Sequence, residues 1–325
     1  MRIHPRSTTT STPAAPAASR PRSRRRTTTG VALALAGGLA SSAFLAAPIA
    51  ASAEDASVVV APASAAAAAT AHWTPERRAA ALAASPAVAA SVSTSAATAS
   101  PESVSDAAGA AVPHPDQPFV GVLFSVDGGR DRACTASVVD TPDGDVIATA
   151  AHCLVDRRSG SATTLATFIP GAQGATAPHG IWPVRVAAVS SAWTTSGRPS
   201  DDAGFARVSG PAGEVLAASV GAAEPVFGTT LVPATGQAPS LAILGYPAAG
   251  SATAALEACE GRPQHDAGGQ TSLPCTLGKG AAGSPVLTFT GEQRAVVARP
   301  SAGRGVLLAT WGADAERALT SLHGR

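Results

Sequence analysis

Aromatic and charged residues are scarce in this sequence of 325 residues, at 4% and 14% of the chain. No acidic residue precedes Glu54, so the first 53 residues hold seven arginines and no negative charge. The remaining 16 basic and 22 acidic residues give the rest of the chain a formal net charge of −6. Because this acidic body has no cluster that combines aromatic and basic residues, the sequence argues against a nucleic-acid partner.

The first 53 residues have the organisation of a signal peptide. Arginine-rich residues 19–26 precede an apolar run of mostly small residues, 30–50, which is followed by Ala-Ser-Ala at 51–53. This pattern predicts cleavage before Glu54 and a secreted, extracellular protein that has no membrane contact after cleavage. An uncleaved membrane anchor is the alternative, since the apolar run approaches the ~20 residues that a span needs. Its glycine, serine and proline content favours cleavage.

The sequence contains four cysteines and no Cys-x-x-Cys pair. An even number of cysteines in an exported protein predicts two disulfides. A zinc site built from Cys259, His265 and Cys275 is a weaker alternative, because structural zinc sites usually have closely spaced ligand pairs. We therefore expect neither a metal nor a cofactor.

Residues 54–117 consist largely of alanine, serine, threonine, proline and valine. Without large apolar residues at regular spacing, this stretch predicts a flexible linker or pro-segment. A short helix is expected within residues 72–84, because Thr74 suits an N-cap, Pro75 the first helical position and Glu76 the positive helix end. Trp73 is the residue through which this helix could dock.

Short apolar runs begin at Phe119 and continue almost to the end of the chain. Most are bounded by Gly, Pro, Asp or Ser, which predicts an all-β domain of many short strands, either one core or two small barrels. Residues 312–324 instead predict a C-terminal helix with Leu319 and Leu322 on one face. The expected strands lie within residues 119–126, 134–140, 145–151, 182–189, 203–208, 240–246, 285–289, 294–300 and 305–311.

Three segments carry candidate functional residues. His152 ends a strand of small residues and has a cysteine beside it. Asp202 precedes an apolar strand, from which its carboxylate can accept the Nδ1–H of a histidine and fix the tautomer. The glycine-rich residues 278–283 can present the backbone N–H groups of Gly280 and Ala282 as an oxyanion hole.

These segments resemble those of the trypsin/chymotrypsin-like serine proteases. CTASVVDTPDGDVIATAAHC (134–153) is similar to the histidine segment of that family, DAGFARV (202–208) to its aspartate segment, and GAAGSPV (280–286) to its nucleophile segment. The Ser-Pro-Val ending resembles the glutamyl-endopeptidase branch, and residues 245–286 are similar to secreted bacterial members. The resemblance covers residues 118–325, which it implies are a serine protease domain.

The resemblance implies a fold of two six-stranded antiparallel β-barrels with a short C-terminal helix and a site between the barrels. It implies an endopeptidase mechanism in which His152 removes the proton of a serine and Asp202 orients His152. It also implies two disulfides, Cys134–Cys153 and Cys259–Cys275. The substrate pocket that it implies includes Thr276, Ser301 and Gly303.

The chain departs from the family pattern at the nucleophile. The serine position holds Ala282, whose methyl group cannot attack a carbonyl or form an acyl-enzyme. His152, Asp202 and the backbone of Gly280 remain. The sequence therefore predicts an inactive homologue or knockout that binds a peptide or protein in the cleft, as a monomer.

Two alternatives stay open. The chain could be an active serine endopeptidase that uses Ser284 as an unusual nucleophile, although that position in the matching motif does not point at the histidine. It could also be a cell-envelope interaction module whose Ala/Pro/Ser-rich region spans the wall. The sequence holds no sorting tail or repeat to support this second alternative.

Overall fold

The computed structural model describes residues 57–60, 65–84, 109–115, 117–247, 255–266, 268–278, 280–301 and 305–325. All of them belong to one compact unit of the chain, Ser52–Arg325. The predicted signal peptide, 1–53, and Gly303 lie outside the described residues. Within the described residues, no helix is both long and apolar enough to cross a membrane.

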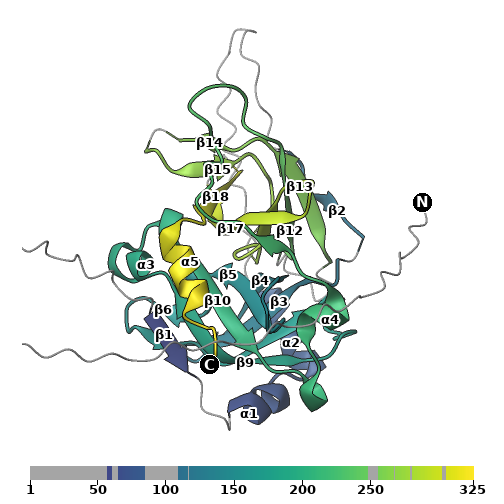
Figure 1. Ribbon diagram of the computed structural model, residues 1–325. Coiled ribbons are helices and arrows are strands. Elements are labelled where there is room, and N and C mark those ends of the chain that lie inside the picture. The colour runs from purple at the N-terminus through teal and green to yellow at the C-terminus, as the bar shows by residue number, and fades with distance from the viewer. Residues whose placement is uncertain are drawn as a thin grey trace, which may run out of the picture. The chain divides into compact units, whose positions relative to one another are not determined.

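The N-terminal half of the domain is a closed barrel (Figure 1). Seven strands form one antiparallel sheet in the order β1-β9-β10-β5-β4-β3-β8, and a pairing between β8 and β9 closes six of them into a ring. The remaining strand, β1, extends β9 on the outside. The bounds are β1 Ser57–Val60, β3 Val120–Asp127, β4 Arg130–Val139, β5 Val146–Ala150, β8 Thr164–Pro170, β9 Trp182–Val189 and β10 Ala203–Val208.

The C-terminal half is a second sheet that stays open. Its path is β14-β15-β18-β17-β16-β12-β13-β2, with β11 paired to β17. The bounds are β2 Val112–Pro113, β11 Glu224–Pro225, β12 Leu241–Gly245, β13 Glu257–Gly261, β14 Gln264–His265, β15 Thr271–Leu273, β16 Pro285–Leu287, β17 Glu292–Ser301 and β18 Gly305–Thr310. A two-stranded sheet of β6 (Val155–Asp156) and β7 (Ser161–Ala162) stands apart.

The two-barrel architecture predicted from the resemblance is confirmed, with one difference: the second half is a half-barrel rather than a closed ring. Pro263 lies between β13 and β14 and, without an N–H, cannot donate to a ladder of hydrogen bonds. The edge strand β14 is only two residues long.

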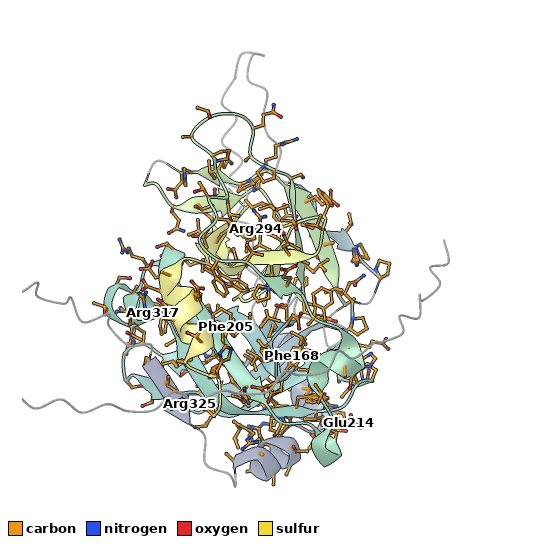
Figure 2. All side chains as sticks on the ribbon, viewed as in Figure 1. Phe168, Phe205, Glu214, Arg294, Arg317 and Arg325 are labelled. Atoms are coloured by element: carbon orange, nitrogen blue, oxygen red, sulfur yellow. A yellow bond between two sulfur atoms is a disulfide. The ribbon has the colours of Figure 1, made fainter. Side chains whose placement is uncertain are left out.

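Apolar side chains fill the interior of both halves and the region where the two halves pack together. Phe168 and Phe205, labelled in Figure 2, are wholly buried in the first half. Phe205 also packs on Trp311, with ring centroids 5.2 Å apart. The predicted C-terminal helix forms as α5 (Ala313–Thr320), shorter than the expected 312–324; Leu319 lies in it and Leu322 in the turn that follows, and both are buried. The other short helices of this region are α3 Ser191–Ser196 and α4 Leu216–Val220.

The described parts of residues 54–117 pack on the domain. Strand β1 pairs with β9 over its whole length, and two helices follow, α1 (Ala65–His72) and α2 (Pro75–Ala84). Helix α2 falls where the capping pattern predicts it. Trp73 is 1% exposed, and its indole N–H donates to the carbonyl of Leu165 at 2.6 Å. Trp73 is thus the docking residue of this segment.

A buried arginine secures the same segment. Arg78 is 5% exposed, and its guanidinium donates to the carbonyls of Ala175 at 2.8 Å and Trp73 at 3.0 Å. Burial lowers the pKa of Arg78. Residues 54–117 were expected to bury too little surface to become ordered. For their described parts this expectation is corrected, because a few large side chains hold them on the domain, although the average composition of the stretch does not indicate this. The removal of this stretch as a pro-segment stays a prediction.

Candidate active site

His152 and Asp202 are brought together at the end of the first barrel. His152 lies in the 3₁₀ turn Ala151–Cys153 after β5, and Asp202 directly precedes β10. Since β5 and β10 are paired, the two residues meet at one barrel rim. Asp202 is 6% exposed, and its carboxylate accepts both the backbone N–H of His152 at 2.9 Å and ring atom Nδ1 at 2.7 Å.

This double contact fixes the histidine for proton transfer. When Nδ1–H is donated to the carboxylate, Nε2 carries no proton and can accept one. This is the tautomer that a general base requires. The neighbouring acid, Asp201, points elsewhere and accepts hydrogen bonds from Ser196 and Arg198. The structure therefore pairs the histidine with Asp202, the residue that the family register selects.

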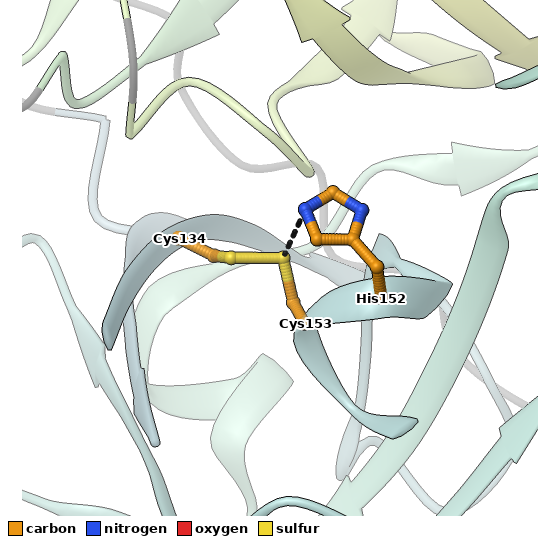
Figure 3. A group of neighbouring side chains, drawn as sticks. All are labelled: Cys134, His152 and Cys153. Carbon is orange, nitrogen blue, oxygen red and sulfur yellow. Dashed lines mark hydrogen bonds between the residues drawn. A yellow bond between two sulfur atoms is a disulfide. The ribbon is translucent and has the colours of Figure 1, made fainter. Parts of the chain in front are cut away.

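The two predicted disulfides, Cys134–Cys153 and Cys259–Cys275, are present. The first joins β4 to the turn of His152, whose Nε2 lies 3.7 Å from the sulfur of Cys153 (Figure 3). All four cysteine sulfurs are bonded in disulfides. Neither the group around His152 nor the alternative zinc site with His265 therefore offers a thiolate to zinc.

The glycine-rich loop of the second half is tied directly to the first barrel. Thr135, next to Cys134, donates its backbone N–H to the carbonyl of Ala282 at 2.8 Å and its hydroxyl to the carbonyl of Gly280 at 2.9 Å. Since Cys134 is bonded to Cys153, a short path of covalent and hydrogen bonds links Ala282 to His152.

Gly283 makes this close approach of loop and barrel possible. Its φ of 86° lies in the left-handed region, and a Cβ at this position would overlap the carbonyl oxygen of Thr135 and the hydroxyl of Thr149. Gly280 also has a positive φ, of 90°. Two glycines of this stretch, Gly280 and Gly283, are therefore required by the geometry of the loop.

A groove of about 460 Å³ passes along these residues. His152, Gly280 and Ala282 all line it, together with Ala298 of β17. The sequence-predicted histidine, oxyanion residues and nucleophile position therefore share one surface. Other residues of this lining were not expected from the sequence: Ala84, Arg130, Arg132 and Arg299. Arg130 and Arg132 lie just before the histidine segment, so their proximity along the chain was the available signal, whereas nothing in the sequence marked Arg299.

Ser284 does not line the groove. It is wholly buried, and no hydrogen-bond partner of its hydroxyl is recorded among the described residues. The hydroxyl oxygen lies against Gly245 of β12, where an added Cβ would overlap it. This side chain therefore faces the interior of the second half.

Of the predicted pocket residues, the two that the structure describes, Thr276 and Ser301, do not line the groove. Thr276 is exposed, and its hydroxyl accepts the backbone N–H of Ala111 at 2.9 Å. Its own N–H donates to the carbonyl of Gly109 at 3.1 Å. Ser301 ends β17 and does not line the groove, and Gly303 is not described. The stretch 54–117, called the leader segment below, thus contacts the threonine expected at the pocket base, through Gly109 and Ala111.

Solved structures share this arrangement of two β-barrel halves. Protease Anisep from Arthrobacter nicotinovorans matches 64% of this chain and 97% of its own, with 23% identity and a TM-score of 0.57. The thermostable serine protease AL20 from an extremophilic microorganism matches 64% of this chain and 99% of its own, with the same identity and TM-score. The fold is that of the chymotrypsin-like serine proteases.

A glutamyl endopeptidase also has this serine protease fold. It matches 67% of this chain and 97% of its own, with 17% identity and a TM-score of 0.53. No known family model matches this sequence, and no curated protein matches it. The matched share leaves about a third of the chain outside the serine protease fold of these structures.

Proposed function

We propose that this protein is a secreted serine protease homologue that binds a peptide or protein segment in the groove beside His152 without cleaving it. The observation that carries the proposal is the position of Ala282. It lines the groove together with His152 and is hydrogen-bonded to Thr135, which supports its assignment to the nucleophile position.

The chemistry of the remaining groups supports this assignment. Nε2 of His152 could accept a proton from a hydroxyl at position 282, and Asp202 would stabilise the imidazolium that forms. An alanine supplies neither the hydroxyl proton nor the lone pair that attacks the carbonyl. Loss of a triad nucleophile lowers turnover by about a millionfold, while the groove can still hold a peptide.

The burial of Ser284 argues against the alternative nucleophile. A serine that attacks a bound peptide has to reach the groove and contact the base. Ser284 is 0% exposed and lies against Gly245. We therefore rank the inactive homologue above an enzyme that uses Ser284.

Reaction with a fluorophosphonate probe tests the proposal. Wild type is expected to remain unlabelled and to leave unstructured protein substrates intact. Ala282→Ser should react with the probe and cleave peptides, and His152→Ala on that background should abolish both. Labelling of wild type that disappears in Ser284→Ala would overturn the proposal in favour of the alternative nucleophile.

A further inference from the structure

The leader segment completes an edge of strand β9 in the first barrel. Strand β10 occupies one edge of β9, so β8 and β1 share the other. The pairing with β8 involves only Trp182 and Pro183 of β9, and β1 pairs with residues 186–189 further along. Without β1, these residues, Val-Ala-Ala-Val, would present unpaired N–H and C=O groups on an apolar edge. Strand β1 thus closes a gap that the strands of the barrel itself leave.

The backbone of β8 is strained where it meets the leader segment. Leu165 has a φ of 52°, and among the described residues it is the single non-glycine residue with a positive φ. It lies at an irregularity in the pairing of β8 with β3, where Leu165 and Ala166 stand opposite Ser125 alone. The left-handed region is unfavourable for leucine, so surrounding contacts must hold the residue there. One such contact is the indole N–H of Trp73, which donates to the carbonyl of Leu165 at 2.6 Å.

Buried side chains hold the helices of the leader segment on the same side of the barrel. The ring of Trp73 packs on Phe124 of β3, with centroids 5.2 Å apart. The guanidinium of Arg78 is buried and donates to the carbonyl of Ala175, in the loop after β8. Helix α1 packs on β8 and β9. Release of these residues would expose apolar surface and leave two barrel carbonyls without their donors, so it has an energetic cost.

Helix α2 extends from these buried side chains to the groove beside His152. In its first turn, Arg77 donates two hydrogen bonds to the carboxylate of Asp131 in β4, at 2.7 and 3.1 Å. The last residue of α2, Ala84, lines the groove together with residues 130–134 of β4. The exposed side chain of Ala84 therefore forms part of the groove wall on the side of β4. Without α2, the groove would lack this part of its wall.

We propose that residues 57–84 of the leader segment are a permanent part of the folded protein. They stay bound to the first barrel when the chain between residues 84 and 109 is cut, and Ala84 remains a wall of the groove that limits the ligands it accepts. This differs from the removal expected of a pro-segment, because a strand pairing, a strained backbone and buried side chains hold these residues in place. The role of Ala84 rests on the proposed peptide-binding function, whereas the retention of residues 57–84 does not.

Cutting the chain within the leader segment tests the retention. The recognition sequence of a site-specific viral protease would be inserted between Ser95 and Ala96 of the secreted chain, and the purified protein would be cut to completion. In size-exclusion chromatography of the native protein, the N-terminal piece should elute together with the domain, and urea should separate the two. Elution of the N-terminal piece on its own from the native protein would overturn the proposal.

Substitution of Trp73 shows whether the described contacts are what retains the piece. Trp73→Ala should release most of the N-terminal piece from the cut protein, because it removes the ring and the indole donor that contact the barrel. Trp311→Ala is the matched control, since Trp311 is also buried but packs on Phe205 near α5. Arg78→Gln is the second variant if Trp73→Ala fails to fold. Similar release from the Trp73 and Trp311 variants would contradict the proposal, because global stability alone would then explain the retention.

A second measurement tests the wall. On the Ala282→Ser background, Ala84→Trp should lower kcat/KM for fluorescein-labelled casein about tenfold, because the indole would fill part of the groove. Ala83→Trp is the matched control and should retain the rate, since Ala83 is exposed on the same helix but does not line the groove. Equal losses in the two variants would refute the role of Ala84. Absence of probe labelling in a folded Ala282→Ser protein would refute the proposed function and this role with it, but not the retention of residues 57–84.

Discussion

The backbone N–H of Thr135 donates a hydrogen bond to the carbonyl oxygen of Ala282 at 2.8 Å, and so joins the two halves of the domain at the candidate active site. The hydroxyl of the same threonine donates to the carbonyl of Gly280 at 2.9 Å and accepts the backbone N–H of Tyr246 at 3.0 Å. One wholly buried side chain thereby positions the loop that carries both predicted oxyanion donors.

The first prediction concerns that side chain. Thr135→Val keeps the shape but removes the hydroxyl that donates to the carbonyl of Gly280 and accepts from the N–H of Tyr246. We expect the free energy of unfolding to fall by about 1–3 kcal/mol. On the Ala282→Ser background we also expect kcat to fall at least tenfold, because the loop loses one of its ties.

Ser137→Ala is the control for this variant. Ser137 is also buried and donates its hydroxyl to Oε1 of Gln293 at 2.9 Å, without contacting the loop. It should lower stability to a similar degree in urea unfolding while kcat is retained. Equal losses of kcat in the two variants would show that Thr135 acts through global stability only.

A second prediction separates Asp202 from its neighbour Asp201. On the Ala282→Ser background, Asp202→Asn replaces one of the two accepting carboxylate oxygens with an amide NH₂, which favours the opposite tautomer of His152. The rate of peptide cleavage should fall by about 10⁴-fold. Asp201→Asn should leave most of the rate, because Asp201 bonds to Ser196 and Arg198 rather than to the histidine. The reverse order of effects would show that the aspartate segment has been assigned in the wrong register.

Local motifs made the centre of the site predictable from the sequence. His152, Asp202 and Ala282 each lie in a short segment of recognisable sequence. The order of these segments along the chain also matches the family pattern. The tie between Thr135 and Ala282 was not predictable in this way, because it joins residues far apart in the chain whose individual types are unremarkable. The arginines that line the groove were also missed, since no residue type marks a groove until the fold brings its two sides together.

The leader segment shows a different limit of sequence reasoning. Its average composition is typical of a linker, and the capping residues Thr74 and Pro75 indicated only that a helix begins there. The docking depends on Trp73 and Arg78, whose acceptors, Leu165 and Ala175, lie about a hundred residues further along. Because every residue has a backbone carbonyl, the sequence does not show which carbonyl accepts a hydrogen bond. This contact could therefore not be predicted.

The third prediction is that Trp73 anchors the leader. Trp73→Ala should lower the free energy of unfolding by about 3–5 kcal/mol, because it empties a buried site beside Phe124. Trypsin should then cut the folded protein at Arg77 and Arg78, which wild type protects. Trp73→Phe should cost much less, since it keeps most of the apolar contact and loses only the bond to Leu165. Rapid cutting of wild type at Arg78 would contradict the docked arrangement.

The last prediction uses the pKa of Asp131, the acid that holds α2 at the groove. Burial raises this pKa, but the hydrogen bonds and charges of Arg77 and His72 outweigh burial, so that it lies below its ordinary value. A carboxyl whose pKa is lower in the folded than in the unfolded state stabilises the fold above the unfolded pKa of ~3.9. That contribution is lost as the pH falls through the folded pKa. The urea midpoint of wild type should therefore exceed that of Asp131→Asn at about pH 5, and the margin should close as the pH falls below about 4. Arg77→Gln should reduce the margin, because it removes the guanidinium that donates two hydrogen bonds to the carboxylate of Asp131. A margin that persists unchanged to pH 2.5, or that widens in acid, would show that the ion pair does not hold the leader to β4.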